Sequence, residues 1–145
     1  MTCKLQMTLI SEHQEGDCGE DWKYDLEVEV FHEGLKGEGA FNVPKHNLIS
    51  GQVKEPHGAP EPQIIFRGEC LTELLVKIKL TATEVDLFVN DVGTASKDIR
   101  IECPGPAGDK VTREVDIAAG VREAPAILNR NAVFTVRVRF SLSCD

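Results

Sequence analysis

In the stretch from Ala132 to Cys144, apolar and polar side chains alternate from Phe134 onward. Because strand side chains point to opposite faces in turn, this pattern predicts a β-strand with one apolar and one wet face. A helix would scatter the same apolar residues around its circumference. A lone strand is not stable, so the chain must supply neighbouring strands and a second layer over the apolar face. The apolar positions are Phe134, Val136, Val138, Phe140, Leu142 and Cys144.

Similar alternation recurs along the chain and predicts eight or nine strands in all. Turn residues separate them, together with one long proline-rich piece at residues 45–62. The fold class that we expect is all-β, an antiparallel two-sheet β-sandwich with Ig-like or C2-like architecture. A closed β-barrel is the second choice, and residues 1–145 are expected to form a single domain. The strands are expected at residues 3–10, 24–32, 40–43, 63–66, 74–82, 85–89, 99–103, 111–117 and 132–144.

Glycine and proline suggest where these strands end. Residues 11–22 contain two glycines and no periodicity, so we expect an acidic loop there. Residues 33–39 are expected to form a hairpin turn, and Pro44 is expected to end the third strand because proline cannot donate into a ladder. Residues 92–98 are predicted to be a second turn region, and residues 126–129 are a candidate for a single helical turn.

The net charge of the chain is −8, and the excess acid is concentrated in one segment. Residues 11–38 hold ten acidic residues against two lysines, which leaves the rest of the chain nearly neutral. Proteins that bind nucleic acid cluster Lys and Arg against the phosphates, so we expect no nucleic-acid partner. An anionic membrane would be repelled for the same reason, unless a divalent cation bridges the two surfaces.

Five widely spaced cysteines form no Cys-x-x-Cys pair, and we expect no signal peptide before them. This pattern favours a reduced, cytoplasmic setting. Cys3, Cys103 and Cys144 fall at the ends of expected strands, where we expect them to act as small buried apolar side chains. No run approaches the roughly 20 apolar residues of a membrane helix, so no integral membrane segment is expected.

The acidic loop at residues 12–21 is the first candidate site. Hard cations such as calcium take six to eight oxygen ligands, and Gly16 and Gly19 allow the sharp bends that such a loop needs. A second acidic turn around Asp91 and Asp98 is expected to close over it. The site resembles C2 domains in architecture only, because their regular Asp-x-Asp ligand pattern is missing. The alternative is a solvated loop that keeps the protein soluble. The predicted calcium ligands are Glu15, Asp17, Glu20, Asp21, Asp91 and Asp98.

Catalytic motifs are not visible in the sequence. It contains no Gly-x-Ser-x-Gly, no P-loop and no Gly-x-Gly-x-x-Gly. A reactive thiol needs a positive neighbourhood, and the carboxylates around Cys18 oppose that. We therefore expect no enzymatic activity. An enzyme of unrecognised type is the third hypothesis, and it would require Cys or His to converge with two carboxylates in one cleft.

Two charge stripes are candidates for an interface. Arg137 and Arg139 share the wet face of the terminal strand, and three acids share a face of the strand at residues 24–32. If these two strands pair, opposite charges meet across the ladder. Otherwise each stripe faces another subunit in a charge-matched interface. Trp22, beside the acidic loop, is either an interface anchor or a cap on the core.

Together these features predict a non-enzymatic β-sandwich module for binding or assembly. Its expected partner is another protein or a second copy of the chain, and it needs no cofactor. The alternative is a calcium-dependent module that binds a ligand or a membrane through residues 12–21, with calcium as the cofactor.

Overall fold

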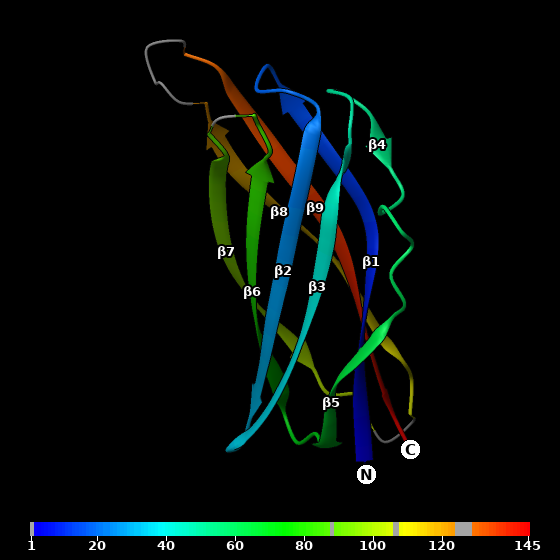
Figure 1. Cartoon of the computed structure of the whole chain (residues 1–145). Coiled ribbons are helices and arrows are strands. Elements are labelled where there is room, and N and C mark those ends of the chain that lie inside the picture. Colours follow the sequence, from blue (N-terminus) through cyan, green and yellow to red (C-terminus); the bar gives the residue numbers. More distant parts are fainter. Residues whose placement is uncertain (1, 88, 106–107, 124–128) are drawn as a thin grey trace.

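The structure is a computed structural model that describes residues 2–87, 89–105, 108–123 and 129–145. These residues form nine strands and no helix, arranged as two stacked antiparallel sheets that do not close into a barrel (Figure 1). One sheet has the order β4-β1-β9-β8, with β5 also paired to β1, and the other has the order β3-β2-β6-β7. The predicted sandwich is confirmed, and the closed barrel is wrong. The strands are β1 (Thr2–Gly16), β2 (Asp21–His32), β3 (Leu35–Asn47), β4 (Val53–Lys54), β5 (Gln63–Glu69), β6 (Glu73–Glu84), β7 (Asp91–Glu102), β8 (Val111–Arg122) and β9 (Asn131–Cys144).

The apolar faces of the two sheets meet in one continuous core. β9 lies inside its sheet between β1 and β8, and every second side chain from Ala132 to Leu142 is at most 3% exposed. β2 and β6 occupy the equivalent place in the other sheet and alternate in the same way. Removing apolar surface from water stabilises such a core by roughly 25 cal/mol per Å². The terminal strand is therefore the central element that its sequence pattern predicted.

β1 is longer than its alternation suggested, because a bulge shifts its phase. The register against β9 shifts between Leu9 and Ser11. After the bulge Glu12 and Gln14 point inward, with exposed fractions of 1% and 0%. An inserted residue reverses which parity faces the core. The predicted loop at residues 11–22 was consequently too long, and the connection between β1 and β2 covers only residues 17–20.

The other differences fall largely on edge strands. β3 continues through Pro44, where its register with β2 is irregular and where an edge strand has no second ladder to lose. Residues 92–98, predicted as a turn, form the middle of β7, which pairs only with β6. Of the alternating residues 85–89, predicted as a strand, residues 85–87 and 89 lie in the connection between β6 and β7, and residue 88 lies outside the described residues. The predicted helical turn at residues 126–129 falls mostly outside the described residues.

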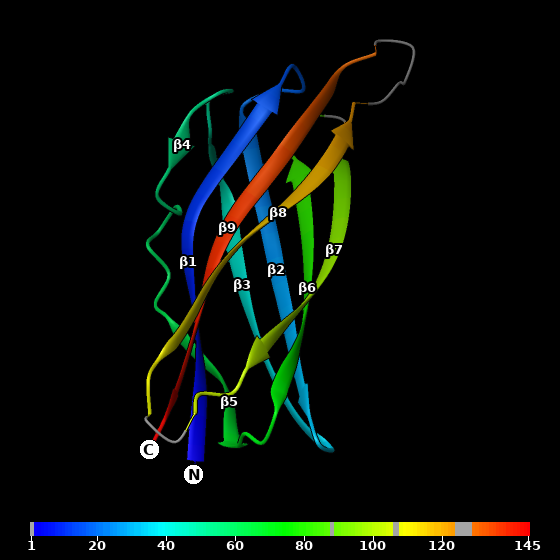
Figure 2. The ribbon, with the colours of Figure 1, turned by 180° about the vertical axis from the view of Figure 1, so that it is seen from behind.

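On both long sides of the sandwich, a glycine allows the backbones of the two sheets to come into close contact. A Cβ on Gly93 of β7 would strike the carbonyl oxygen of Gly120 in β8, and a Cβ on Gly37 of β3 would strike that of Ile65 in β5. Each pair joins strands of different sheets that are not paired with one another. Figure 2 shows β7 and β8 approaching in this way along one side. Glycine thus allows the two sheets to touch at their edges.

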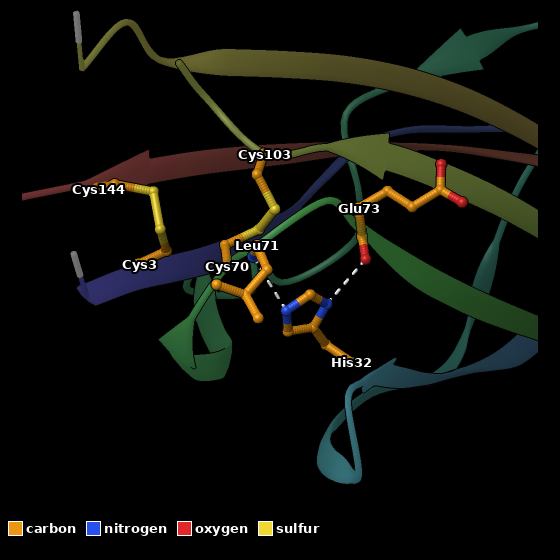
Figure 3. The surroundings of a disulfide bond; sticks show 7 residues. All are labelled: Cys3, His32, Cys70, Leu71, Glu73, Cys103 and Cys144. Carbon is orange, nitrogen blue, oxygen red and sulfur yellow. Dashed lines mark hydrogen bonds between the residues drawn. A yellow bond between two sulfur atoms is a disulfide. The ribbon is translucent and has the colours of Figure 1, made fainter. Parts of the chain in front are cut away.

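Two disulfides lie at the end of the sandwich that also holds both termini (Figures 1 and 3). Cys3–Cys144 joins opposed residues of β1 and β9, with Cα atoms 4.0 Å apart. Cys70–Cys103 ties the crossing from β5 to β6 to the end of β7, with Cα atoms 5.6 Å apart. The expectation that Cys3, Cys103 and Cys144 are unpaired buried side chains is wrong, because strand pairing brings together positions far apart in sequence. Cys18 remains a buried free thiol.

His32 fixes the crossing next to Cys70 (Figure 3). Its Nδ1 lies 2.9 Å from the carbonyl oxygen of Glu73, and the amide of Leu71 donates to its Nε2 over 3.1 Å. A carbonyl can only accept and an amide can only donate, so the ring is neutral with its proton on Nδ1. The chain is therefore held on both sides of this corner as it passes from one sheet to the other.

Candidate functional site

The connections from β1 to β2 and from β6 to β7, and the end of β8, lie at the end of the sandwich opposite the two termini (Figure 1). Several acidic residues fall in these segments. We call this end the acidic pole and define it as residues 17–21, 84–87 and 89–91 together with Glu123. Two contacts tie its parts together: the amide of Val85 donates to the carbonyl of Asp21 over 2.7 Å, and the Cys18 thiol donates to the carbonyl of Val121 over 3.6 Å. These two hydrogen bonds hold the segments of the acidic pole, and the acidic residues on them, in fixed positions relative to one another.

A pocket of about 490 Å³ opens at the acidic pole. Its described lining includes four acidic residues and one lysine, Lys45. Leu87, which also lines the pocket, is 91% exposed, and Val89 of the same loop is 52% exposed. The pocket thus combines a negatively charged lining with an apolar lip. The acidic lining residues are Glu20, Asp21, Glu84 and Asp86.

Three acidic side chains of the acidic pole are buried: Glu84, Asp91 and Glu123 are only 5%, 4% and 7% exposed. Glu84 and Asp91 oppose one another where β6 and β7 end, and their side chains are hydrogen-bonded. The Oε2 atoms of Glu84 and Glu123 have no hydrogen-bond donor among the described residues, although Arg130 Nη1 lies 3.7 Å from that of Glu123. Burial, reinforced by Asp86 and by the other two buried acids, raises the pKa of Glu84 to about 7.

The free thiol of Cys18 lies against the same acids. Burial raises its pKa to about 11, and the negative charges of Glu123, Asp17 and Glu84 add to the shift. A thiol with this pKa stays protonated at neutral pH, whereas a nucleophilic cysteine acts as the thiolate. Cys18 is therefore placed as a packed side chain of the acidic pole rather than as a nucleophile.

Another buried carboxylate, Glu12, belongs to a hydrogen-bonded group inside the sandwich. It accepts hydrogen bonds from the Tyr24 hydroxyl and the His57 amide, both over 2.8 Å, and its second oxygen contacts Nε2 of His46. The other nitrogen of His46 lies 2.8 Å from the carbonyl of Pro44, and its ring stacks on that of His57 with centroids 4.4 Å apart. Burial, then the charge of Glu12, raises the pKa of Tyr24. Since both ring nitrogens of His46 are bonded, and the backbone amide of His57 also donates to Glu12, the group fastens the proline-rich segment to β1.

The residues predicted as calcium ligands do not converge on one point. Asp98 lies in the middle of β7, roughly 23 Å along the strand from Asp91, with its carboxylate 4.0 Å from Lys77. Asp17 accepts a hydrogen bond from the amide of Asn131 over 2.9 Å. Across the described part of the chain, no three His, Cys, Asp or Glu residues are placed to hold a metal ion. The acidic pole does bring Asp17, Glu20, Asp21 and Asp91 to one end of the molecule, with Glu15 just before them at the end of β1.

Glu84 and Glu123 were missed by the sequence reasoning, although a signal for them exists. Every second side chain of β6 faces the core, and Glu84 is the next such residue after Ala82. Glu123, directly after the end of β8, follows Val121 in the same way. An acid on the inward parity of an otherwise apolar strand predicts a buried carboxyl group. The same rule applies to Asp91 at the start of β7.

Trp22 lies in the core and not on the surface of the sandwich. Its side chain is 0% exposed and packs on Phe134 with ring centroids 5.2 Å apart. The indole N–H donates to the carbonyl of Gly19 over 3.0 Å. The residue therefore links the loop between β1 and β2 to the centre of the sandwich.

The two charge stripes belong to different sheets, so their predicted pairing with one another is wrong. Arg137 and Arg139 form ion pairs with Asp116 and Glu114 of β8, at 2.8 Å and 2.6 Å. The acidic face of β2 is opposed by the lysines of its neighbour β6. Each stripe is thus neutralised within its own sheet, and the acidic pole is left as the place where charge is least balanced.

No known family model matches the chain, and no curated protein is significantly similar to it in sequence. Across the parts of the chain that the structure describes, no helix has the length and apolar character needed to span a membrane. What the protein binds therefore has to be inferred from the chemistry of the acidic pole.

Proposed function

We propose that the protein is a non-enzymatic binding module that docks a positively charged segment of a partner protein at the acidic pole. The observation that carries this proposal is the pocket itself, with its acidic lining beside the exposed apolar side chain of Leu87. Lys and Arg side chains have long apolar stems and charged tips, and they suit such a combination. The net charge of −8 would also steer a cationic partner toward the protein.

A second copy of the chain is a less suitable partner at this pole. It carries the same net charge of −8, and like charges repel on approach. The arginines that stand in line on β9, Arg137 and Arg139, already have carboxylate partners. The bonded nitrogens of His46 and the protonated thiol of Cys18 support a binding role over a catalytic one.

A titration of the ¹⁵N-labelled protein followed by NMR tests the proposal. The probe is a synthetic peptide that alternates lysine with leucine, and the control peptide carries glutamate in place of lysine. We expect saturable shifts at residues 17–21 and 84–91 with the lysine peptide only, and weaker binding at higher salt. The double variant Glu20→Gln, Asp21→Asn should weaken binding by about fivefold or more.

The matched control is Asp25→Asn with Glu27→Gln. It removes the same two charges from the outer face of β2, and we expect it to leave the affinity within twofold of wild type. Equal weakening by both double variants would show that only net charge matters, and it would contradict docking at the acidic pole.

The alternative function is a calcium-dependent module that binds a ligand or a membrane at the same end. It is favoured by the buried oxygens of Glu84 and Glu123 that lack donors, since a cation can satisfy several oxygens at once. It is opposed by the lack of any three suitable ligands around one point within the described residues. A rise of several degrees in the unfolding midpoint with calcium, and not with magnesium, would favour this alternative.

The compartment in which the protein works is a separate proposal. The cytoplasmic setting stays a prediction from cysteine spacing, and the two disulfides favour an oxidising compartment instead. We propose the oxidising compartment. Alkylation of the denatured, unreduced protein should modify Cys18 alone, whereas modification of all five cysteines in protein isolated from its native cell would support the cytoplasm.

A further inference from the structure

Two carboxyl groups close the paired ends of β6 and β7, at the base of the connection to which residues 85–87, 89 and 90 belong. Glu84 and Asp91 are opposed residues at the paired ends of β6 and β7, and both are at least nine-tenths buried. Their side chains are hydrogen-bonded to one another. Two ionised carboxylates have only acceptors, so this hydrogen bond exists only while one of the two groups carries a proton. The same loop presents Leu87 to solvent and lines the pocket of the acidic pole.

The surroundings of Glu84 discourage its ionisation from several sides. Asp86 lies in the connection after β6, Asp91 opposes Glu84 on β7, and Glu123 follows β8. The Cys18 thiol, from the connection between β1 and β2, is an uncharged neighbour. Of the cationic groups nearby, Arg130 is directed to Glu123, and Lys45 lines the outer pocket. The carboxyl group also packs against Gly19, where a Cβ would collide with it. The nearby negative charges and the burial of the side chain both favour the protonated form of Glu84.

We propose that a proton on the carboxyl group of Glu84, donated in a hydrogen bond to Asp91, latches the paired ends of β6 and β7, and that loss of this proton as pH rises loosens them. With one proton between them, the two carboxyl groups can stay buried and hydrogen-bonded. Two ionised carboxylates in contact would repel one another, and their burial would cost free energy because both charges lose their hydration. On release the charge of Glu84 adds to the acidic lining of the pocket. This inference rests on the proposed function only where it concerns docking: the latch makes the docking end sensitive to pH.

The direction of the pH dependence follows from the raised pKa of Glu84. Its carboxyl group titrates near pH 7 in the folded protein and ordinarily near 4.5, so between these values only the folded state holds the proton. The stabilisation is therefore full below about pH 4.5 and is lost as the pH rises to 7. Over this interval the unfolding equilibrium constant should increase by up to roughly 300-fold because of this one group.

The test uses the free protein without any partner. A ¹³C NMR titration of the side-chain carboxyl carbons should place the midpoint of Glu84 near pH 7. Thermal unfolding between pH 4.5 and 8 should show a loss of stability that Glu84→Gln removes, because an uncharged amide can donate to Asp91 at every pH. The matched control is Glu73→Gln. Glu73 lies at the other end of β6, opposite another acid, Glu102, but it forms an ion pair with Arg100 and its side chain is more exposed than that of Glu84. It should keep the pH dependence of the wild type.

A titration midpoint of Glu84 below pH 5, or an unchanged pH dependence in Glu84→Gln, overturns the latch. If Glu84→Gln does not fold, the titration of the wild type still decides. A calcium-specific rise in the midpoint that Glu84→Gln abolishes also overturns it, because a cation then occupies the place of the proton. Loss of peptide binding with an intact titration would refute the docking proposal alone, so the two failures are distinguishable.

Discussion

Replacing Cys3 and Cys144 by serine removes the covalent link between the first and last strands, and the size of the effect can be worked from the chain. The bridged residues are 141 positions apart, against 33 for Cys70 and Cys103. In the chain-entropy description, a disulfide stabilises the native state by restricting the unfolded one, and more so for a longer loop. The estimates are about 5 kcal/mol for the outer bridge and about 4 kcal/mol for the inner one.

These energies translate into large shifts of the unfolding midpoint. With an unfolding entropy of about 2.1 cal/mol/K per residue, the outer double variant should unfold roughly 16 °C below wild type and the inner one roughly 12 °C below. Circular dichroism at a fixed pH measures both, and mass spectrometry after alkylation checks the number of free thiols. Equal midpoints for wild type and Cys3→Ser, Cys144→Ser would refute the reasoning, as would a larger loss from the inner pair.

Three further predictions concern stability. Glu12→Gln removes the charge that three polar groups converge on inside the sandwich, and urea unfolding should show a loss of about 3 kcal/mol; a loss near zero would mean that the group is not formed. Replacing Arg137 or Asp116 by alanine breaks only a surface ion pair, so the thermal midpoint should stay within about 2 °C of wild type, and a larger shift would contradict this. Gly93→Ala should lower the midpoint because its Cβ meets the backbone of β8, whereas Gly120→Ala, with open space, should not; equal midpoints would argue against the close approach.

The central strands could be predicted because the sheets bury their alternating faces without interruption, as in β9 and β2. The prediction failed where a local backbone feature changes which parity points inward. One extra residue near Ile10 turns Glu12 toward the core, and no propensity announces a bulge at that place. At β7 the inward positions include Gly93 and Ala95, because the neighbouring sheet edge comes too close for large side chains. Small residues of this kind resemble a turn when only the sequence is considered.

The site was predictable in composition but not in geometry. The acidic residues around Asp17 lie at one end of the molecule, whereas Asp98 lies away from that end, in β7 beside Lys77. Which acids are buried depends on where each strand stops relative to the core, as the inward parity of Glu84 illustrates. The disulfides are beyond such reasoning, because five cysteines allow many pairings and only the strand order selects among them.

The bridge between Cys3 and Cys144 also determines how the molecule responds to force. The bridge encloses residues 3–144 in one covalent ring, so tension applied to the chain before Cys3 and after Cys144 passes through one sulfur–sulfur bond and bypasses both sheets. The oxidised protein should therefore behave as a short, inextensible connector. After reduction the same pull unzips the sandwich and releases up to roughly 480 Å of chain at about 3.4 Å per residue, which single-molecule extension with and without reductant can measure.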